Sequence, residues 1–502
     1  MAEALIGVDI GTQGTKAAAF TAAGKCLAST FVPSKLYQPG GGVVEEDPEY
    51  QVTTVCRAVS GCVGKSRMGA GSIAGIGIDG QMAGVIGVGQ DGVHVTPYDS
   101  WLDTRCAPYI KMMREKAGRR VIEKTGGPPS FNHGPKILWW KHERPEVYQR
   151  IAAFVQPGGY AAMRLCGLDG AAAFIDHTYL HFSGFADNRE QRWDAGLCRT
   201  FDVDRARLPR IVEPHTVVGQ LTAAMARRCG LRAGVPVIAG CGDTAASFLA
   251  CGATREGVCV DVAGTASVFA ATTGTYSFDT RHEVLGWGRS ATPGLWHPYA
   301  YINGGGMNLE WFRTQLAARG KKAPTLARLN ARAARLPPSL DDPLFVPHLG
   351  GRVSPSWPDL RGAWAGVTWD HSAAHLYRAV LEGVALEYGI YRDVLLERVS
   401  DLKLSEVRVT GGGEKSALWN RIKADALGTR VVRVTRPEGG PLGSALLAGH
   451  GVGIFRSLNA TARRWIKTTT PLKPNSQRRT FYDTRLRKYR ELLDVLQGWS
   501  SE

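Results

Sequence analysis

The sequence lacks the features that mark secreted, membrane-spanning or disulfide-stapled proteins. Its ten cysteines are irregularly spaced and include no Cys-x-x-Cys pair, which argues against a zinc site or a disulfide framework. No stretch of about 18 uncharged apolar residues occurs, so we expect no ordinary membrane helix. The first residues carry no basic segment followed by an apolar run. We therefore expect no signal peptide and a cytoplasmic protein.

Two segments match nucleotide-binding motifs only in part. A P-loop over residues 61–66 would need glycine at position 59, where Val59 stands, and a preceding strand where a helix is predicted. Residues 75–80 satisfy Gly-x-Gly-x-x-Gly, but the following residues favour another strand rather than the helix that a dinucleotide site requires. His133 has no second histidine at metal-ligand spacing, so we interpret it as a turn or substrate-wall residue.

Glycine and positive charge are abundant instead. The chain has 61 glycines, clustered at 304–306 and 411–413 and repeated singly over 71–92, which suits sharp turns and close backbone approach to a ligand. The formal charge is +16, yet the basic residues are scattered and do not interleave with aromatic residues. We expect a diffuse positive field that favours anionic substrates such as nucleotides, and no nucleic-acid partner.

The two halves of the chain begin alike. A length of 502 residues, with 44% hydrophobic and 21% charged residues, predicts two globular domains of similar size. Residues 4–9 form a short apolar run that ends in Asp9 and continues into the glycine turn 11–15. Residues 257–267 again carry an aspartate in an apolar run before Gly264-Thr265. Such an echo indicates duplicated domains.

Strands and helices alternate along the predicted chain. The first strand is expected to form a hairpin with the residues after the glycine turn, and residues 235–243 indicate a strand that delivers Asp243 after a glycine. Helical spacing of apolar residues marks 49–65, 376–398 and 482–496. This alternation predicts an α/β fold. We place the domain boundary near residue 242.

Aspartates beside glycine turns suit phosphoryl transfer, which depends on positioning and electrostatic stabilisation. Backbone N–H groups of a glycine turn and threonine hydroxyls donate to phosphate oxygens, and Lys16 could add positive charge. Asp9 fits the role of recruiting Mg²⁺, which usually retains waters. Asp243 is the candidate base that accepts the proton of an attacking hydroxyl. For either aspartate taken alone, the alternative is a turn carboxylate bonded to its own backbone.

A long pattern in the second half points to a family. Residues 362–367 read Gly-Ala-Trp-Ala-Gly-Val, and after seven residues 375–382 read His-Leu-Tyr-Arg-Ala-Val-Leu-Glu. This pattern resembles the C-terminal signature of the FGGY family of carbohydrate kinases, within the actin-like ATPase superfamily. Residues 345–352 (with Gly351 in place of the customary glutamate) and 437–445 also resemble the family, and 136–140 resembles its Lys-x-x-Trp core more loosely.

The resemblance implies two ribonuclease-H-like (actin-like ATPase) domains with a catalytic cleft between them. It implies a sugar-binding domain over 1–242 and a nucleotide-binding domain over 243–502. In that reading Asp243 is the catalytic base, and Asp9 and Asp243 hold Mg²⁺. The ATP-binding residues that it implies are Gly11, Thr12, Gln13, Thr15, Lys16, Gly264, Thr265, Gly305, Gly306, Gly411, Gly412 and Gly413.

The sugar side departs from the family pattern at two positions. Residues 80–84 look like the Gly-Gln-Met-His-Gly loop of xylulokinases, with Ala83 in place of the histidine. Thr244 stands after the base where xylulokinases usually have asparagine. Residues 101–105 are similar to the family's Trp-x-Asp-x-Arg element. The substrate-binding residues that the resemblance implies are Gln81, Met82, Trp101, Asp103, Arg105 and Asp243.

We therefore expect a kinase that uses Mg-ATP to phosphorylate a hydroxyl of a small sugar or polyol, most readily a ketopentose such as D-xylulose. The two departures leave open another polyol, a ketotetrose or a sugar acid, because a site that pairs each hydroxyl discriminates by about 10⁴ or more. A catalytically silent nucleotide-binding regulator and an ATP-driven chaperone or filament are the other classes. The retained Asp243 argues against the regulator, and the Trp-x-Asp-x-Arg element argues against the chaperone. A homodimer is expected from the resemblance alone.

Overall fold

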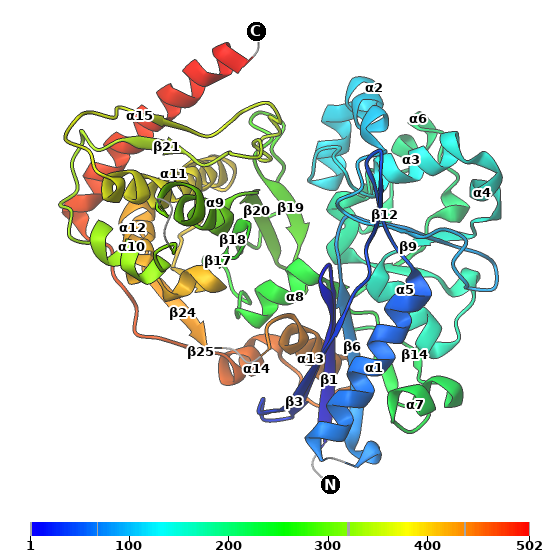
Figure 1. The fold of residues 1–502 in the computed structure, drawn as a ribbon. Coiled ribbons are helices and arrows are strands. Elements are labelled where there is room, and N and C mark those ends of the chain that lie inside the picture. Colours follow the sequence, from blue (N-terminus) through cyan, green and yellow to red (C-terminus); the bar gives the residue numbers. More distant parts are fainter. Residues whose placement is uncertain (1–2, 68, 319–321, 436–437, 501–502) are drawn as a thin grey trace.

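Two lobes lie side by side, each built on a seven-stranded sheet (Figure 1). The computed structural model describes residues 3–67, 69–318, 322–435 and 438–500. The first sheet has the order β14 (Val217–Gln220), β15 (Pro236–Ile238), β6 (Ile73–Gly80), β1 (Ala4–Gly11), β2 (Gly14–Thr21), β3 (Cys26–Pro33), with β16 (Cys241–Gly242) beside β6. The second has the order β19 (Gly286–Arg289), β20 (Trp296–Ile302), β18 (Ser267–Ala271), β17 (Val258–Ala263), β23 (Glu406–Thr410), β24 (Val431–Thr435), β25 (Lys467–Thr468).

The two sheets share one topology. In the first, β1, β2 and β3 are antiparallel neighbours, and β6 and β15 continue from β1 as parallel strands. In the second, β17, β18 and β20 are antiparallel, and β23 and β24 continue from β17 in parallel. The predicted hairpin after the first strand, the duplication and the α/β class with ribonuclease-H-like domains are therefore confirmed.

Helices cover both faces of each sheet. In the first lobe, α1 (Pro48–Ser66), α5 (Pro157–Cys166) and α7 (Ala223–Cys229) pack on one face, and α8 (Asp243–Ala250), α13 (Gly440–Gly451) and α14 (Leu458–Trp465) on the other. In the second lobe, α11 (Ala373–Arg398), α12 (Ala417–Leu427) and α15 (Ser476–Ser500) share the main core with the sheet. The remaining helices are α2 (Ala107–Thr125), α3 (His133–Glu143), α4 (Pro145–Arg150), α6 (Ala195–Thr200), α9 (Gly305–Trp311) and α10 (Leu326–Ala333).

Short strands complete the lobes: β4 (Tyr37–Gly40), β5 (Val43–Glu46), β7 (Ile86–Val88), β8 (Tyr98–Asp99), β9 (Ala153–Val155), β10 (Phe174–Asp176), β11 (Ala186–Asp187), β12 (Arg192–Trp193), β13 (Arg210–Val212), β21 (Leu344–Val346) and β22 (Ala363–Ala365).

The three predicted helices appear as α1, α11 and α15. Residues 61–66 lie inside α1, and a strand follows β6, so neither segment has the structure of the motif that it partly matches. No helix within the described ranges is long and apolar enough to cross a membrane.

Helix α13 returns from the far end of the chain to cover the first sheet. A Cβ atom on Gly7 would lie 1.8 Å from the carbonyl oxygen of Pro441, and one on Gly77 would lie 2.2 Å from that of Ser444. Gly75 likewise faces α13, where a Cβ would lie 2.9 Å from a methyl of Val452. The glycines of residues 75–77 therefore serve close helix packing, whereas the sequence suggested close approach to a ligand.

We expect Gly77→Ala to lower the free energy of unfolding by about 1–3 kcal/mol, because the new methyl overpacks the contact between β6 and α13. Gly64→Ala is the matched control: a Cβ there meets nothing within 4 Å, and alanine in α1 should stabilise by about 0.5–1 kcal/mol. Urea unfolding of both variants measures the difference. Equal stability of the two would show that the helix does not press on this strand.

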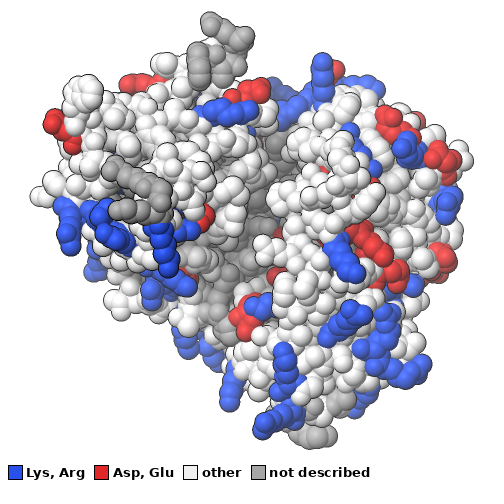
Figure 2. Space-filling model, viewed as in Figure 1, with Lys and Arg blue, Asp and Glu red and all other residues white. Residues whose placement is uncertain are grey.

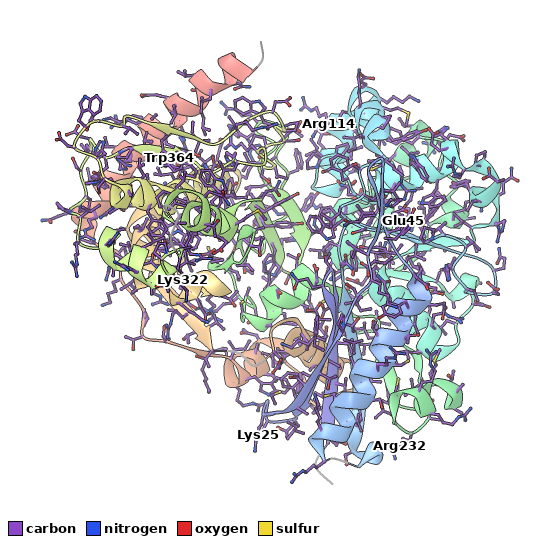
Figure 3. The ribbon with its side chains drawn as sticks, viewed as in Figure 1. Lys25, Glu45, Arg114, Arg232, Lys322 and Trp364 are labelled. Carbon is purple, nitrogen blue, oxygen red and sulfur yellow. The ribbon has the colours of Figure 1, made fainter. Side chains whose placement is uncertain are left out.

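Helix α8 is shared between the two lobes. Its residues Ala246 and Leu249 belong to the core beneath the first sheet, while Phe248 packs with Val258 and Val260 of the second sheet. A second junction lies on α2, where Arg114 (labelled in Figure 3) pairs with Glu283 of the second lobe at 2.7 Å. Figure 2 shows a deep hollow between the lobes and Lys and Arg side chains spread over both. The start of α8 therefore lies where the two lobes meet.

Candidate active site

Three carboxylates converge at the ends of neighbouring strands. Asp9 on β1 and Asp79 on β6 are register partners on parallel strands, so their side chains project from the same face of the sheet. Strand β16 pairs with the end of β6, with Cys241 opposite Asp79, and leads directly into Asp243 at the start of α8. On the same face, a Cβ on Gly440 at the start of α13 would lie 2.8 Å from the Asp9 carboxylate. The fold thus brings Asp9 and Asp243 together, as the sequence suggested.

Like charge and burial raise the proton affinity of this cluster. Burial and the neighbouring Asp9 raise the pKa of Asp243 to about 7, although the Thr244 hydroxyl donates to its Oδ1 at 3.0 Å. Burial and Asp9 also raise the pKa of the fully buried Asp79 well above its usual range, against the opposing hydrogen bond from the Ser444 hydroxyl. A carboxyl with a pKa near 7 is suited to general-base catalysis at neutral pH.

Asp79 is a member of this cluster that the sequence motifs do not predict. It stands inside residues 75–80, which match Gly-x-Gly-x-x-Gly through their glycines. The signal that could have found it is positional: an aspartate ends an apolar run immediately before the predicted sugar loop. Parallel strands align their carboxyl ends, so that position predicts a neighbour for Asp9.

The first glycine turn forms as predicted, but its side chains are engaged elsewhere. It joins β1 to β2, and its backbone is held by Ser34, whose N–H donates to the Gln13 carbonyl at 3.1 Å. The Thr15 hydroxyl points to the opposite face and bonds the Thr54 hydroxyl of α1 at 2.6 Å. Lys16 shares the face of Asp9 and pairs with Glu438 at 2.5 Å. Gln13, between the two strands, is exposed.

Three glycine segments of the second lobe meet around the end of β17. The N–H of Gly306 donates to the carbonyl of Gly264 at 2.9 Å, which joins the β17–β18 turn to the start of α9. A Cβ on Gly411 would lie 2.7 Å from the carbonyl oxygen of Ala263, so the loop after β23 also packs against β17. The structure therefore groups the predicted nucleotide residues of this lobe, namely Gly264, Thr265, Gly305, Gly306, Gly411, Gly412 and Gly413.

The aspartate that echoes Asp9 in the second lobe has a structural role. Asp261 on β17 is fully buried, accepts a hydrogen bond from the Tyr388 hydroxyl at 2.8 Å and pairs with the ammonium of the buried Lys423. Lys423 also lies 3.8 Å above the ring of Trp419. The second half of the repeat thus keeps the strand and the glycine turn, while its carboxylate is neutralised in the core.

On the predicted sugar side, Asp103 and Arg105 are bound to each other. The Arg105 guanidinium donates to the Asp103 carboxylate at 2.9 Å and to Asp99 at 3.0 Å, and it pairs at 2.6 Å with Glu45 of β5, which is labelled in Figure 3. Asp103 also accepts the N–H of Val44 at 2.9 Å. These two side chains hold the loop in shape, and Trp101, whose side chain is 46% exposed, is its open member.

The loop after β6 packs against Gly242, at the start of α8. The sulfur of Met82 lies so close to Gly242 that a Cβ there would be 1.8 Å away. A ring nitrogen of His133 bonds the Met82 carbonyl at 2.6 Å, and burial lowers the pKa of this histidine to about 4. His133, at the start of α3, therefore supports the loop as a neutral side chain. Met82 therefore lies beside Gly242, the residue before Asp243, and Gln81 precedes it on the same loop.

Two ribonuclease-H-like lobes of this topology, with carboxylates at their junction and glycine turns at the strand ends, place the chain in the actin-like ATPase class. Two models of one family also match the chain: the N-terminal domain of the FGGY family of carbohydrate kinases over residues 4–250, and its C-terminal domain over residues 259–452. The chain belongs to the FGGY family of carbohydrate kinases.

Named relatives align over almost the full length. The chain is 27% identical over 499 residues to the xylulose kinase of Bacillus subtilis, covering 98% of this chain and 95% of that protein. It is 25% identical over 472 residues to the gluconokinase of the same organism, covering 92% and 90%. The crystal structure of xylulose kinase from Rhodospirillum rubrum superposes with a TM-score of 0.91 at 26% identity, covering all of both chains.

Proposed function

We propose that the protein transfers the γ-phosphoryl group of ATP to a hydroxyl of a small sugar or polyol, with Asp243 as the general base. The observation that carries this proposal is the position of Asp243, at the lobe junction beside Asp9 with a pKa of about 7. The deprotonated carboxylate accepts the proton of the attacking hydroxyl as the oxygen approaches phosphorus. Closure of the lobes would exclude the water that competes as acceptor.

The residues fit a cation of the Mg²⁺ type. Mg²⁺ keeps several waters and binds through one or two carboxylates together with substrate phosphates, and it would supply charge neutralisation for the transferred group. Asp9 and Asp243 would hold it from the protein side. Within the described ranges no three His, Cys, Asp or Glu side chains form an all-protein metal site, which agrees with that sparse mode of binding. The glycine backbones of the two lobes would donate to the phosphates.

For the substrate we propose a ketopentose such as D-xylulose. Supporting this choice are the similarity to xylulose kinases and the retained Gln81-Met82 pair, of which Met82 packs against Gly242, the residue before Asp243. Ala83 and Thr244 weaken it, and the similarity to a gluconokinase makes a sugar acid the second candidate. We further propose that residues 1–242 hold the sugar and 243–502 the nucleotide, although α8, α13 and α14 of the second range pack on the first sheet.

A coupled assay of ADP release tests the function. Ketopentoses, ketotetroses, glycerol-like polyols and aldonates are offered in turn with Mg-ATP, and we expect turnover with D-xylulose. Turnover with an aldonate alone would identify a sugar acid as the substrate in place of D-xylulose and would leave the kinase assignment unchanged. Release of ADP that no sugar stimulates would favour a nucleotide-binding regulator of the same fold.

The double variant Ala83→His/Thr244→Asn should raise kcat/KM for D-xylulose by about tenfold, because it restores two polar partners for substrate hydroxyls. Ala23→His, on the exposed turn between β2 and β3, is the control for an added histidine. Steady-state kinetics with D-xylulose and with gluconate measure the change. A double variant that loses activity on D-xylulose would contradict the assignment of these positions to the sugar pocket.

A further inference from the structure

A chain of hydrogen bonds joins the predicted phosphate turn to the predicted sugar loop. The side-chain amide of Gln81 donates to the Glu46 carboxylate at 2.8 Å, and the Thr12 hydroxyl donates to the carbonyl oxygen of that amide at 3.3 Å. The indole N–H of Trp101 donates to the Thr12 oxygen at 2.8 Å. Gln51 of α1 donates to the second oxygen of Glu46 at 3.2 Å. The chain therefore runs from α1 through β5 and both loops to the exposed tryptophan.

The direction of each bond is set by its neighbour. A carboxylate can only accept, so Glu46 fixes the Gln81 amide with its nitrogen toward β5 and its oxygen toward the glycine turn. That oxygen takes the single proton of the Thr12 hydroxyl, which leaves the lone pairs of Thr12 for the indole N–H of Trp101. Gln81 is 1% exposed and Glu46 is 3% exposed, so water cannot readily replace these partners.

From this geometry we infer that Thr12 is a positioning residue for the sugar side of the cleft, acting with Glu46 to orient Gln81 and Trp101. The inference rests on the proposed function, since it assigns these two side chains to the sugar. It also changes the role suggested by the resemblance, in which the Thr12 side chain belongs to the ATP site. Its one hydroxyl proton is already given to Gln81, so donation to a phosphate would require breaking that bond.

The phosphate turn and the sugar loop accordingly form one hydrogen-bonded unit. The main chain reinforces it, because the N–H of Gln81 donates to the carbonyl of Ile10 at 3.1 Å and the Ser34 hydroxyl donates to the carbonyl of Thr12 at 2.5 Å. The backbone N–H groups of the turn remain available for phosphates, while its threonine side chain faces the acceptor. Neither Thr12 nor Glu46 needs to touch the reacting atoms for this role.

Thr12→Val and Thr12→Ser form a matched pair that tests the inference. Valine keeps the shape of threonine and removes the hydroxyl, which leaves the Gln81 oxygen and the Trp101 N–H without their partner; serine keeps the hydroxyl. We expect Thr12→Val to raise the sugar KM by about tenfold or more and to change the ATP KM by less than about twofold, with Thr12→Ser close to the parent. An increase confined to the ATP KM, or no change in either constant, would overturn the inference.

A second readout does not depend on turnover. The emission of Trp101 is obtained as the difference between each protein and its Trp101→Phe counterpart, and acrylamide quenching reports the freedom of the ring. Thr12→Val should increase the quenching constant of this component, and Thr12→Ser should not. If the parent phosphorylates no sugar, the proposed function fails, and this measurement still decides the inference: equal quenching in the two variants would refute it.

Replacement of Glu46 probes the other end of the chain. Glu46→Ala should raise the sugar KM in the same direction as Thr12→Val, because Gln81 loses the partner that orients it. Glu46→Gln should be milder: the Oε1 atom of Gln51 has no partner among the residues described, so that amide can turn and accept the new N–H. Equal sugar KM values for Glu46→Ala and the parent would contradict a positioning role for this carboxylate.

Discussion

Replacing Asp243 by asparagine is expected to lower kcat by about 10²–10⁴ while the affinity for ATP stays within about twofold. Asparagine keeps the size of the side chain and its place at the start of α8, but it cannot accept the proton of an attacking hydroxyl. The parent should also show an acid limb in kcat/KM: Asp243 must be deprotonated to act, so activity falls as the pH drops below about 7. A pH–rate profile from about pH 5.5 to 8.5 measures this limb.

Asp169→Asn is a control for the asparagine variant, because Asp169 also stands at the start of a short helical segment but lies on the exposed surface. Its turnover should equal that of the parent. Calorimetric titration with ATP separates a lost base from a lost nucleotide site. An Asp243→Asn protein that keeps more than about a tenth of the parent kcat would remove Asp243 as the base.

Lys423→Met is expected to lower the free energy of unfolding by about 3–5 kcal/mol. Lys423 and Asp261 are both fully buried, and the ammonium is the cation that balances this carboxylate. Methionine fills much of the same volume, so the loss comes mainly from a buried charge that keeps, among the residues described, the Tyr388 hydroxyl as its side-chain partner. Urea unfolding followed by circular dichroism measures it.

The double variant Lys423→Met/Asp261→Asn should recover part of that loss, since it removes the stranded charge together with its partner. Lys403→Met, at an exposed lysine before β23, should change stability by less than about 0.5 kcal/mol. A single Lys423 variant as stable as the Lys403 variant would show that the Lys423–Asp261 pair does not stabilise the fold.

Much of the fold was predictable because local pattern and packing agree. An apolar run that carries an aspartate and leads into a glycine turn occurs in both halves, and each forms a central strand of its sheet. Asp9 and Asp243 were also predictable, since strand ends collect polar residues at the edge where ligands bind. The family resemblance added the glycine segments of the second lobe, which hold no carboxylate or other distinctive chemistry of their own.

The rest depends on contacts that no local pattern carries. Thr15 stands in the glycine turn, but strand alternation sends its hydroxyl to α1, whereas Lys16 falls on the face of Asp9. Asp9 and Asp261 look alike in sequence, and only the distant Lys423 makes the second one structural. Glycine at positions 75 and 77 allows close approach of either a ligand or a helix. The structure shows that α13, more than three hundred residues later in the chain, packs there.

That last contact has a consequence for biosynthesis. A ribosome finishes β1 and β6 early, yet it reaches the helix that covers them only near residue 440. At about 5–20 residues per second, α13 is synthesised some tens of seconds after β6, and until then the glycine-lined surface of the first sheet is uncovered. During that time the emerging polypeptide presents apolar strands to other chains, so its yield in a cell should depend on chaperone supply. A messenger truncated before α13 would make a fragment that aggregates.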